Sequence, residues 1–208
     1  MATAQEIITS FELQIDDTTD LSSTEELRLL NKIYNDICSL LPWEFLKKAF
    51  TGTTSTTVDY IALPSDFQYI VQNANYTDSS YSAFRPVVFV GPSFVPYQVV
   101  SWSDRRQYRN QDGYCYVDIV NSRLCFTKQP TEALAVEFDY IYIPADLTLS
   151  DSPVFPARFH DAIKYAMSVE DNIIQQSDKA KSYAAENKQL YKEAIADMRL
   201  WNANLQQM

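Results

Sequence analysis

The chain has 208 residues, of which 46% are hydrophobic and 21% are charged, a composition typical of a folded globular protein and unlike that of a disordered chain. Its 17 basic and 27 acidic side chains give a formal net charge of -10, which argues against nucleic-acid binding as the main role, because an acidic chain repels phosphate. With 14 tyrosines and only 3 glycines, the chain suits broad contact surfaces better than glycine-rich catalytic loops.

The first 50 residues show helical patterns. Residues 4–14 predict a short helix. Ser23 followed by Glu26 predicts a capping box, in which two side chains accept hydrogen bonds from free backbone N–H groups at a helix start. Apolar residues then recur on one face of the following helix, which Pro42 ends: Leu27, Leu30, Tyr34, Ile37 and Leu41. A compact apolar cluster comes next: Trp43, Phe45 and Leu46.

Residues 51–150 show the pattern of β-strands. Residues 114–126 predict a hairpin that turns at Asn121 and Ser122, and residues 133–143 alternate as one long strand. Residues 51–64 are also β-rich, and three further segments predict strands: 67–76, 85–90 and 96–102.

After Ser150 the helical pattern returns, with Pro156 suited to a first helical turn. One face of this helix carries four apolar residues: Ala162, Ala166, Val169 and Ile173. A last helix reaches Trp201, and the residues beyond it are expected to fray or to form a tail. The predicted fold is therefore α+β, with residues 1–50 and 151–208 as one helical core domain and residues 51–150 as an antiparallel sheet or sandwich inserted into it.

The sequence predicts no catalytic, cofactor or metal site. His160 is the single histidine and no nucleophile motif accompanies it, no two histidines can hold zinc, and no phosphate loop or dinucleotide fingerprint occurs. Cys38, Cys115 and Cys125 have no metal-ligand spacing and are expected to be buried free thiols. A disulfide between Cys115 and Cys125 across the predicted hairpin remains the alternative.

A basic cluster with interleaved aromatic residues lies in the β region: Trp102, Arg105, Arg106, Tyr108 and Arg109. Such a cluster favours either contact with acidic residues of a neighbouring subunit or a solvent-exposed face, and a loop that faces DNA is the alternative. Three residues of the last helix complete the candidate interface: Tyr191, Trp201 and Leu205.

The order of several motifs resembles the head-to-tail adaptor, or connector, proteins of tailed bacteriophages. The motifs are S-S-T-E-E-L, P-W-E-F-L, L-P-S-D-F, then F-P-A-R-F-H-D-A-I-K-Y-A-M and Y-K-E-A-I-A-D-M near the end. The resemblance implies a ring, usually of twelve copies, under the portal, with residues 22–41 and 157–203 as its helical core. It also implies a β insertion that faces the tail or nozzle protein, and a segment after Trp201 that reaches the portal.

The expected function is therefore structural and not enzymatic: a ring between portal and tail that continues the channel for DNA ejection. The expected partners are further copies of the chain, the portal protein, a tail or nozzle protein, and DNA passing through the lumen. No apolar run approaches the length of a signal peptide or membrane span, so the protein is expected to be made in the cytoplasm of its producing cell. The resemblance implies assembly in the host cytoplasm and residence in the virion at the head–tail interface. The alternatives are another neck or tail ring protein and a carbohydrate-binding β-sandwich with an aromatic platform around Tyr97, Trp102 and Tyr108.

Overall fold

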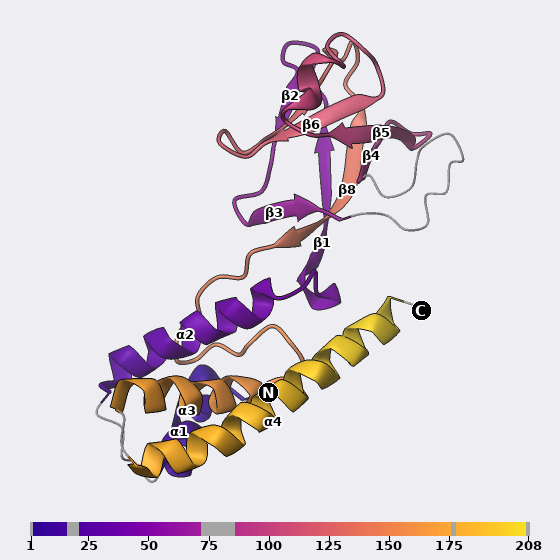
Figure 1. Ribbon diagram of the computed structural model, residues 1–208. Helices are drawn as coiled ribbons and strands as arrows, with labels where there is room; N and C mark the ends of the chain where they lie inside the picture. Colours follow the sequence, from indigo (N-terminus) through magenta and orange to yellow (C-terminus); the bar gives the residue numbers. More distant parts are fainter. Residues whose placement is uncertain (1, 16–20, 72–85, 176–177, 207–208) are drawn as a thin grey trace. The chain divides into compact units, whose positions relative to one another are not determined.

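The computed structural model describes residues 2–15, 21–71, 86–175 and 178–206. The chain folds into two compact units: a helical unit, Met1–Leu46 with Pro144–Met208, and a β unit, Lys47–Ile143 (Figure 1). Helices and strands are thus segregated along the chain, and the predicted α+β class is confirmed. Three expectations lie partly outside the described residues, namely the strands over 67–76 and 85–90 and the position of the Ile173 side chain.

The helical unit joins the two ends of the chain in one core. Its described elements are α1 (Ala4–Gln14), α2 (Ser23–Ser39), η1 (Glu44–Leu46), η3 (Ala157–Phe159), α3 (Asp161–Gln175) and α4 (Asp178–Leu205). Helix α3 packs against α1, α2 and α4. The Ala4 backbone N–H also donates to the Asp151 carbonyl oxygen at 2.8 Å, so the N-terminal helix is held by a segment from the second half of the sequence.

Helix α2 is capped one residue earlier than predicted. Glu25 accepts hydrogen bonds from the backbone N–H of Ser22 at 2.9 Å and from its hydroxyl at 2.6 Å. The predicted pair of Ser23 and Glu26 was wrong because Glu26 lies on the buried face of the helix, where it is 2% exposed. The predicted apolar face is confirmed by three fully buried residues: Leu30, Tyr34 and Ile37.

The apolar cluster after α2 forms an aromatic corner, as predicted. Trp43 is fully buried and donates its indole N–H to the Ile37 carbonyl oxygen at 2.8 Å. The Phe45 ring stacks on Trp43 and on Trp201, with centroids 5.5 and 6.2 Å apart, and tilts against Phe155 at 5.9 Å. Helix α4 therefore contributes to the same corner as the end of α2.

The chain does not fray directly after Trp201, although this was expected. Helix α4 continues to Leu205. Asn202 is buried, and its side-chain oxygen accepts a hydrogen bond from the Glu44 backbone N–H at 2.7 Å. This contact fixes the end of α4 to η1, where the first N–H groups of a short helix need an acceptor.

The β unit contains β1 (Lys47–Thr53), β2 (Tyr60–Ala62), β3 (Phe67–Ile70), β4 (Val87–Val90), β5 (Val95–Val100), β6 (Tyr114–Asp118), β7 (Arg123–Phe126) and β8 (Ala135–Tyr142). They form one sheet in the order β1-β8-β4-β5-β6-β7-β2, with β3 also paired to β8. The sheet is mixed and not wholly antiparallel as expected, because β5 and β6 pair in parallel. Antiparallel pairing of β1 with β8, from Lys47 opposite Ile141 to Thr53 opposite Ala135, joins the first and last strands of the unit.

The strands of the β unit enclose an apolar core, and one face of the long strand β8 lines this core. Val136, Phe138 and Tyr140 of β8 are buried, while Glu137 and Asp139 are exposed, so the predicted alternation is confirmed as far as Tyr140. Ile141, predicted on the face of Glu137, is also buried.

The predicted hairpin of residues 114–126 is also observed, as β6 and β7. Cys115 lies opposite Phe126, and Cys125 lies opposite Tyr116, so the two cysteines occupy successive positions of the ladder and point to different faces. All three cysteines of the chain are free and buried, as expected, and the alternative disulfide does not form.

Candidate interaction surface

Five of the eight predicted interface residues lie in one loop of the β unit, residues 101–113, which is called the arginine loop from here on. It connects β5 to β6 and contains a single 3-10 turn, η2 (Asp104–Arg106). Because β5 and β6 run in parallel, the chain must cross back over the length of the strands before it re-enters the sheet. This crossover explains the length of the loop, and the residues of the loop lie outside the strands of the sheet.

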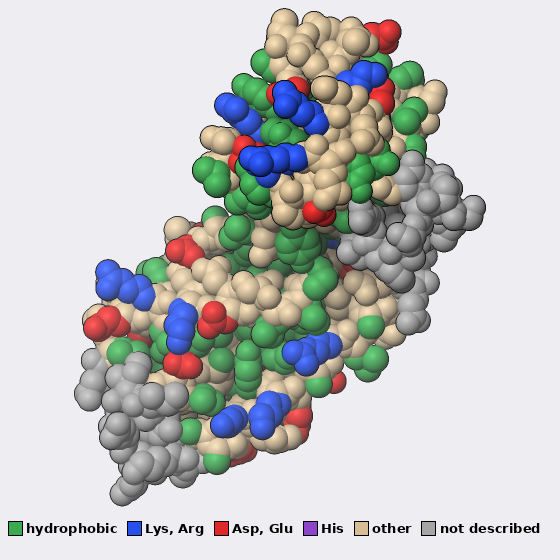
Figure 2. Space-filling view, turned by 45° about the horizontal axis from the view of Figure 1, so that its top comes forward, with side chains coloured by type: hydrophobic (Ala, Val, Ile, Leu, Met, Phe, Trp, Pro, Cys, Tyr) green, Lys and Arg blue, Asp and Glu red, His purple; other side chains and the backbone are tan. Residues whose placement is uncertain are grey.

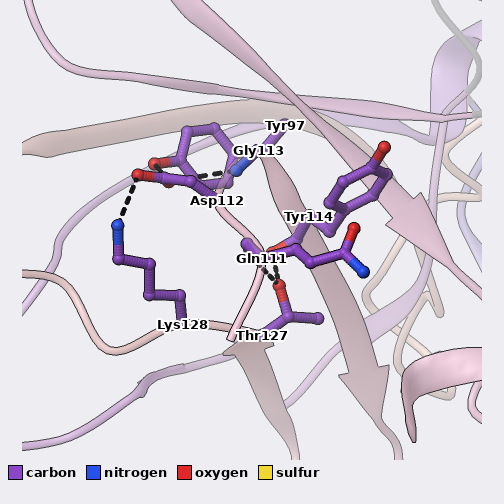
Figure 3. Close-up of polar contacts among 7 residues, drawn as sticks. All are labelled: Tyr97, Gln111, Asp112, Gly113, Tyr114, Thr127 and Lys128. Atoms are coloured by element: carbon purple, nitrogen blue, oxygen red, sulfur yellow. Dashed lines mark hydrogen bonds and ion pairs between the residues drawn. The ribbon is translucent and has the colours of Figure 1, made fainter. Parts of the chain in front are cut away.

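Asp112 holds the end of the loop in place (Figure 3). One carboxylate oxygen accepts from the Tyr97 hydroxyl at 2.6 Å and from the Gly113 backbone N–H at 3.0 Å, and the other lies 3.2 Å from the Lys128 ammonium. The Tyr97 hydrogen bond is the main reason that the pKa of Asp112 is lowered, and burial raises the pKa of Tyr97. Gly113 has φ +82°, a conformation that glycine adopts without strain.

Thr127 on the neighbouring segment fixes the same end of the loop. Its hydroxyl lies 2.7 Å from the Gln111 carbonyl oxygen and 3.0 Å from that of Tyr114, as Figure 3 shows. The Thr127 carbonyl in turn accepts from the Asn110 backbone N–H at 2.9 Å. These anchors were not predicted, because they join residues far apart in the sequence and no local pattern marks them.

The first half of the loop is built around Trp102. Its ring packs edge-on against Tyr116, with centroids 5.5 Å apart, and it remains 49% exposed. The Arg105 guanidinium lies 3.7 Å from the Trp102 ring centroid and donates to the Trp102 carbonyl oxygen. Tyr108 packs on Tyr114 at 4.4 Å between centroids. Arg105 therefore stabilises the position of Trp102 within the same loop.

Arg106 and Arg109 differ from Arg105 because both side chains are exposed, and within the described residues neither forms an ion pair. Figure 2 shows Lys and Arg side chains gathered on the viewed face of the β unit, with hydrophobic side chains between them. Asp112, one of the two acidic residues of the loop, is paired with Lys128. The loop therefore offers two exposed guanidinium groups beside an exposed indole, a combination typical of protein interfaces.

The other three predicted interface residues lie on α4 in the helical unit. Tyr191 is half-buried and lines an open cavity of about 260 Å³ together with Ile33, Ala166 and Val169. Trp201 is half-buried in the aromatic corner, and Leu205 is 36% exposed. The structure thus distributes the eight candidates over two units, and only the five on the arginine loop form a continuous group.

The surface offers binding chemistry and no catalytic constellation. His160 is buried, and in the part of the chain that is described no group of three His, Cys, Asp or Glu side chains could hold a metal. The aromatic residues do not present an open platform for a sugar, because Arg105 covers one face of Trp102, and Tyr97 and Tyr108 are half-buried. Among the described helices, none has the length and apolar character to span a membrane.

Comparison with known protein families gives a match over nearly the whole chain. No curated protein matches the chain. The family model of the SU10 adaptor protein matches residues 2–207, which is nearly the whole chain and includes both units. This is a family of structural phage proteins and not of enzymes, so the resemblance to phage head-to-tail adaptors is confirmed. The chain belongs to the SU10 adaptor protein family.

Proposed function

We propose that this protein forms a ring, of twelve copies, between the portal and the tail of a phage, and that the ring continues the channel through which DNA leaves the head. The observation that carries the proposal is the family match over residues 2–207. A match of that length includes the helical unit and the inserted β unit together, so it supports a role for the whole chain.

The distribution of charge supports a ring that DNA can pass through. The helical unit has 9 basic and 18 acidic side chains, a net charge of -9, whereas the β unit has 8 and 9, a net charge of -1. Copies arranged around an axis would multiply the acidic surface of the helical unit. We propose that this unit lines the lumen, since an acidic wall repels phosphate and leaves DNA free to slide. A lumen lined mainly by Lys and Arg would contradict the proposal.

We propose that the arginine loop contacts carboxylates of a neighbouring virion protein and not DNA. Arg106 and Arg109 are exposed, and guanidinium groups pair with carboxylates in a two-pronged geometry. The overall charge of -10 would oppose a stable complex with DNA. The Arg106→Gln and Arg109→Gln double variant should therefore weaken attachment to the tail protein, while Arg199→Gln, an exposed arginine on α4, should leave attachment unchanged.

The test of the function is to mix the purified protein with the portal ring of the same phage and to image the product by electron microscopy. A second ring stacked under the portal, with the symmetry of the portal, is the expected result. A ring bound only to the tail tube would instead support a tail-terminator role. Absence of any ring, together with absence of the protein from purified virions, would contradict both functions.

A further inference from the structure

Two tight turns of the β unit carry paired, exposed apolar side chains. The Phe94 turn (residues 91–95) exposes 56% of Phe94 and 50% of Val95, and the Val120 turn (residues 118–122) exposes 66% of Ile119 and 92% of Val120. By contrast, the exposed large apolar residues of the described helical unit are single and spread over several elements. Scattered apolar residues on a surface are ordinary, whereas two adjacent ones at a projecting turn mark a contact site.

The Phe94 turn is held in a conformation that a bulky residue rarely adopts. Phe94 has φ +50°, and its N–H donates to the Gly91 carbonyl oxygen at 3.1 Å. The Gly91 N–H donates to the Ala135 carbonyl oxygen at 2.8 Å, which ties the turn to β8. The Phe94 ring meets Phe89 edge-on, with centroids 6.4 Å apart. Sheet contacts thus fix the backbone of the turn while more than half of the Phe94 side chain stays outside the core.

The Val120 turn is fixed in a similar way by polar contacts at its base. The Asp118 carboxylate accepts from the Asn121 backbone N–H at 3.2 Å and from the Asn121 side-chain amide at 2.8 Å. Ser122 has φ +51°, and its carbonyl oxygen accepts from the Leu63 N–H at 2.9 Å. Ile119 and Val120 are therefore presented by a pre-ordered backbone, which lowers the entropy cost of binding.

The two turns lie at opposite ends of the same sheet (Figure 1). Strand β5 begins at Val95, the last residue of the Phe94 turn, and β6 ends at Asp118, the first residue of the Val120 turn. Since the two strands pair in parallel, with Gln98 opposite Tyr114, the turns point in opposite directions along the strands. Val95 and Asp118, at the bases of the two turns, are seven residues apart along the paired strands, which at about 3.3 Å per residue is roughly 23 Å.

We infer that the Phe94 turn of one copy binds the Val120 turn of the next copy, so that the β units join head to tail. This inference rests on the ring proposed above. A closed ring needs two different, complementary patches on each subunit, and two apolar patches on opposite ends of one unit meet that requirement. A partner that bound only one of the two turns would leave the apolar pair of the other turn exposed to water. Contact between the turns removes all four apolar side chains from water.

Cross-linking tests the contact in the portal-bound assembly. A chain that carries both Phe94→Cys and Val120→Cys, treated with a short bismaleimide, should give a ladder of dimers, trimers and larger products. Each single variant alone should give no cross-linked dimer, and an equal mixture of the two should stop at dimers. The three natural cysteines are buried and should not react.

A second pair of variants keeps the test decisive if the cysteines perturb assembly. Val120→Asp should reduce ring formation at least tenfold, whereas Ile143→Asp, at an exposed position of the same unit, should assemble normally. A ring under the portal without a ladder, or cross-links to the portal or tail protein only, would overturn the contact and leave the proposed function standing. Cross-linked dimers from either single variant alone would show a symmetric contact and would also overturn it. No ring at all would overturn both proposals.

Discussion

Replacing Asn202 by alanine should destabilise the helical unit, although this residue lies near the end of the chain in a segment of polar character. Asn202 is buried, and its side-chain oxygen accepts the Glu44 backbone N–H at 2.7 Å. Alanine would leave that N–H without this acceptor. Removing the acceptor of such a partly buried donor costs about 1–3 kcal/mol.

Asn204 provides a matched control on the same helix. It is exposed, two residues away, and has the same gain in helix propensity when replaced by alanine. The difference between Asn202→Ala and Asn204→Ala therefore isolates the hydrogen bond to Glu44. We expect Asn204→Ala to change the free energy of unfolding by less than about 0.5 kcal/mol, as is usual for an exposed substitution.

Thermal and urea unfolding, followed by circular dichroism at the helical band, measures the effect. For a unit of this size, each kcal/mol corresponds to a fall of about 4–8 °C in Tm, so Asn202→Ala should unfold well below the control. Equal midpoints for the two variants would refute the reasoning and would mean that the end of α4 does not stabilise the aromatic corner in solution.

Two further predictions concern buried titratable groups. Burial lowers the pKa of His160, whose Nε2–H donates to the Phe155 carbonyl oxygen, so the unfolded chain binds a proton more readily than the folded chain. The free energy of unfolding should therefore fall between about pH 7.5 and about pH 5.5, by at most about 1.4 kcal/mol per pH unit, and a His160→Gln variant should lose this slope in urea titrations; equal slopes would contradict the assignment. The three cysteines should resist thiol reagents until the chain unfolds, because burial raises thiol pKa values, that of Cys38 to about 12, and labelling of the native protein would show that a thiol is accessible.

The sequence predicts this fold well where burial follows a simple period. The face of α2 and the alternation of β8 both follow the repeat of their element, and both predictions were confirmed. The capping box was shifted by one residue because Ser22 and Ser23 each have a glutamate three positions ahead. Only the burial of Glu26 decides between them, and that depends on the packing of the whole helical unit.

Strand direction was harder to predict than strand position. Alternating side chains look the same in parallel and antiparallel pairs, so the parallel pairing of β5 with β6 has no signature within the strands. The available signal was the length of the connection, since residues 101–113 match the dozen or more residues that a parallel crossover requires.

The arginine loop was recognised from composition, but the different roles of its arginines were not. Arg105 stacks on Trp102, whereas Arg106 and Arg109 remain exposed. All three side chains have the same chemistry, and only the direction that the backbone takes around η2 determines which of them contacts Trp102. The structural role of Asn202 was not predicted for a related reason. A polar residue near the end of a helix gives no sign in the sequence that it accepts a hydrogen bond from a distant backbone N–H, here that of Glu44.

The position of the β unit within the sequence also affects how the chain can fold during synthesis. Residues 47–143 are continuous, and β1 pairs with β8, so this unit can complete its sheet as soon as it has left the ribosome. The helices α1 and α2 must wait for α3 and α4, which follow the β unit; α4 ends at Leu205, 166 residues after the end of α2 at Ser39, so at about 5–20 residues per second the delay is roughly 8–33 s. Throughout that interval Trp43 lacks the core that later buries it, so the nascent N-terminal helices are the part of the chain most in need of a chaperone.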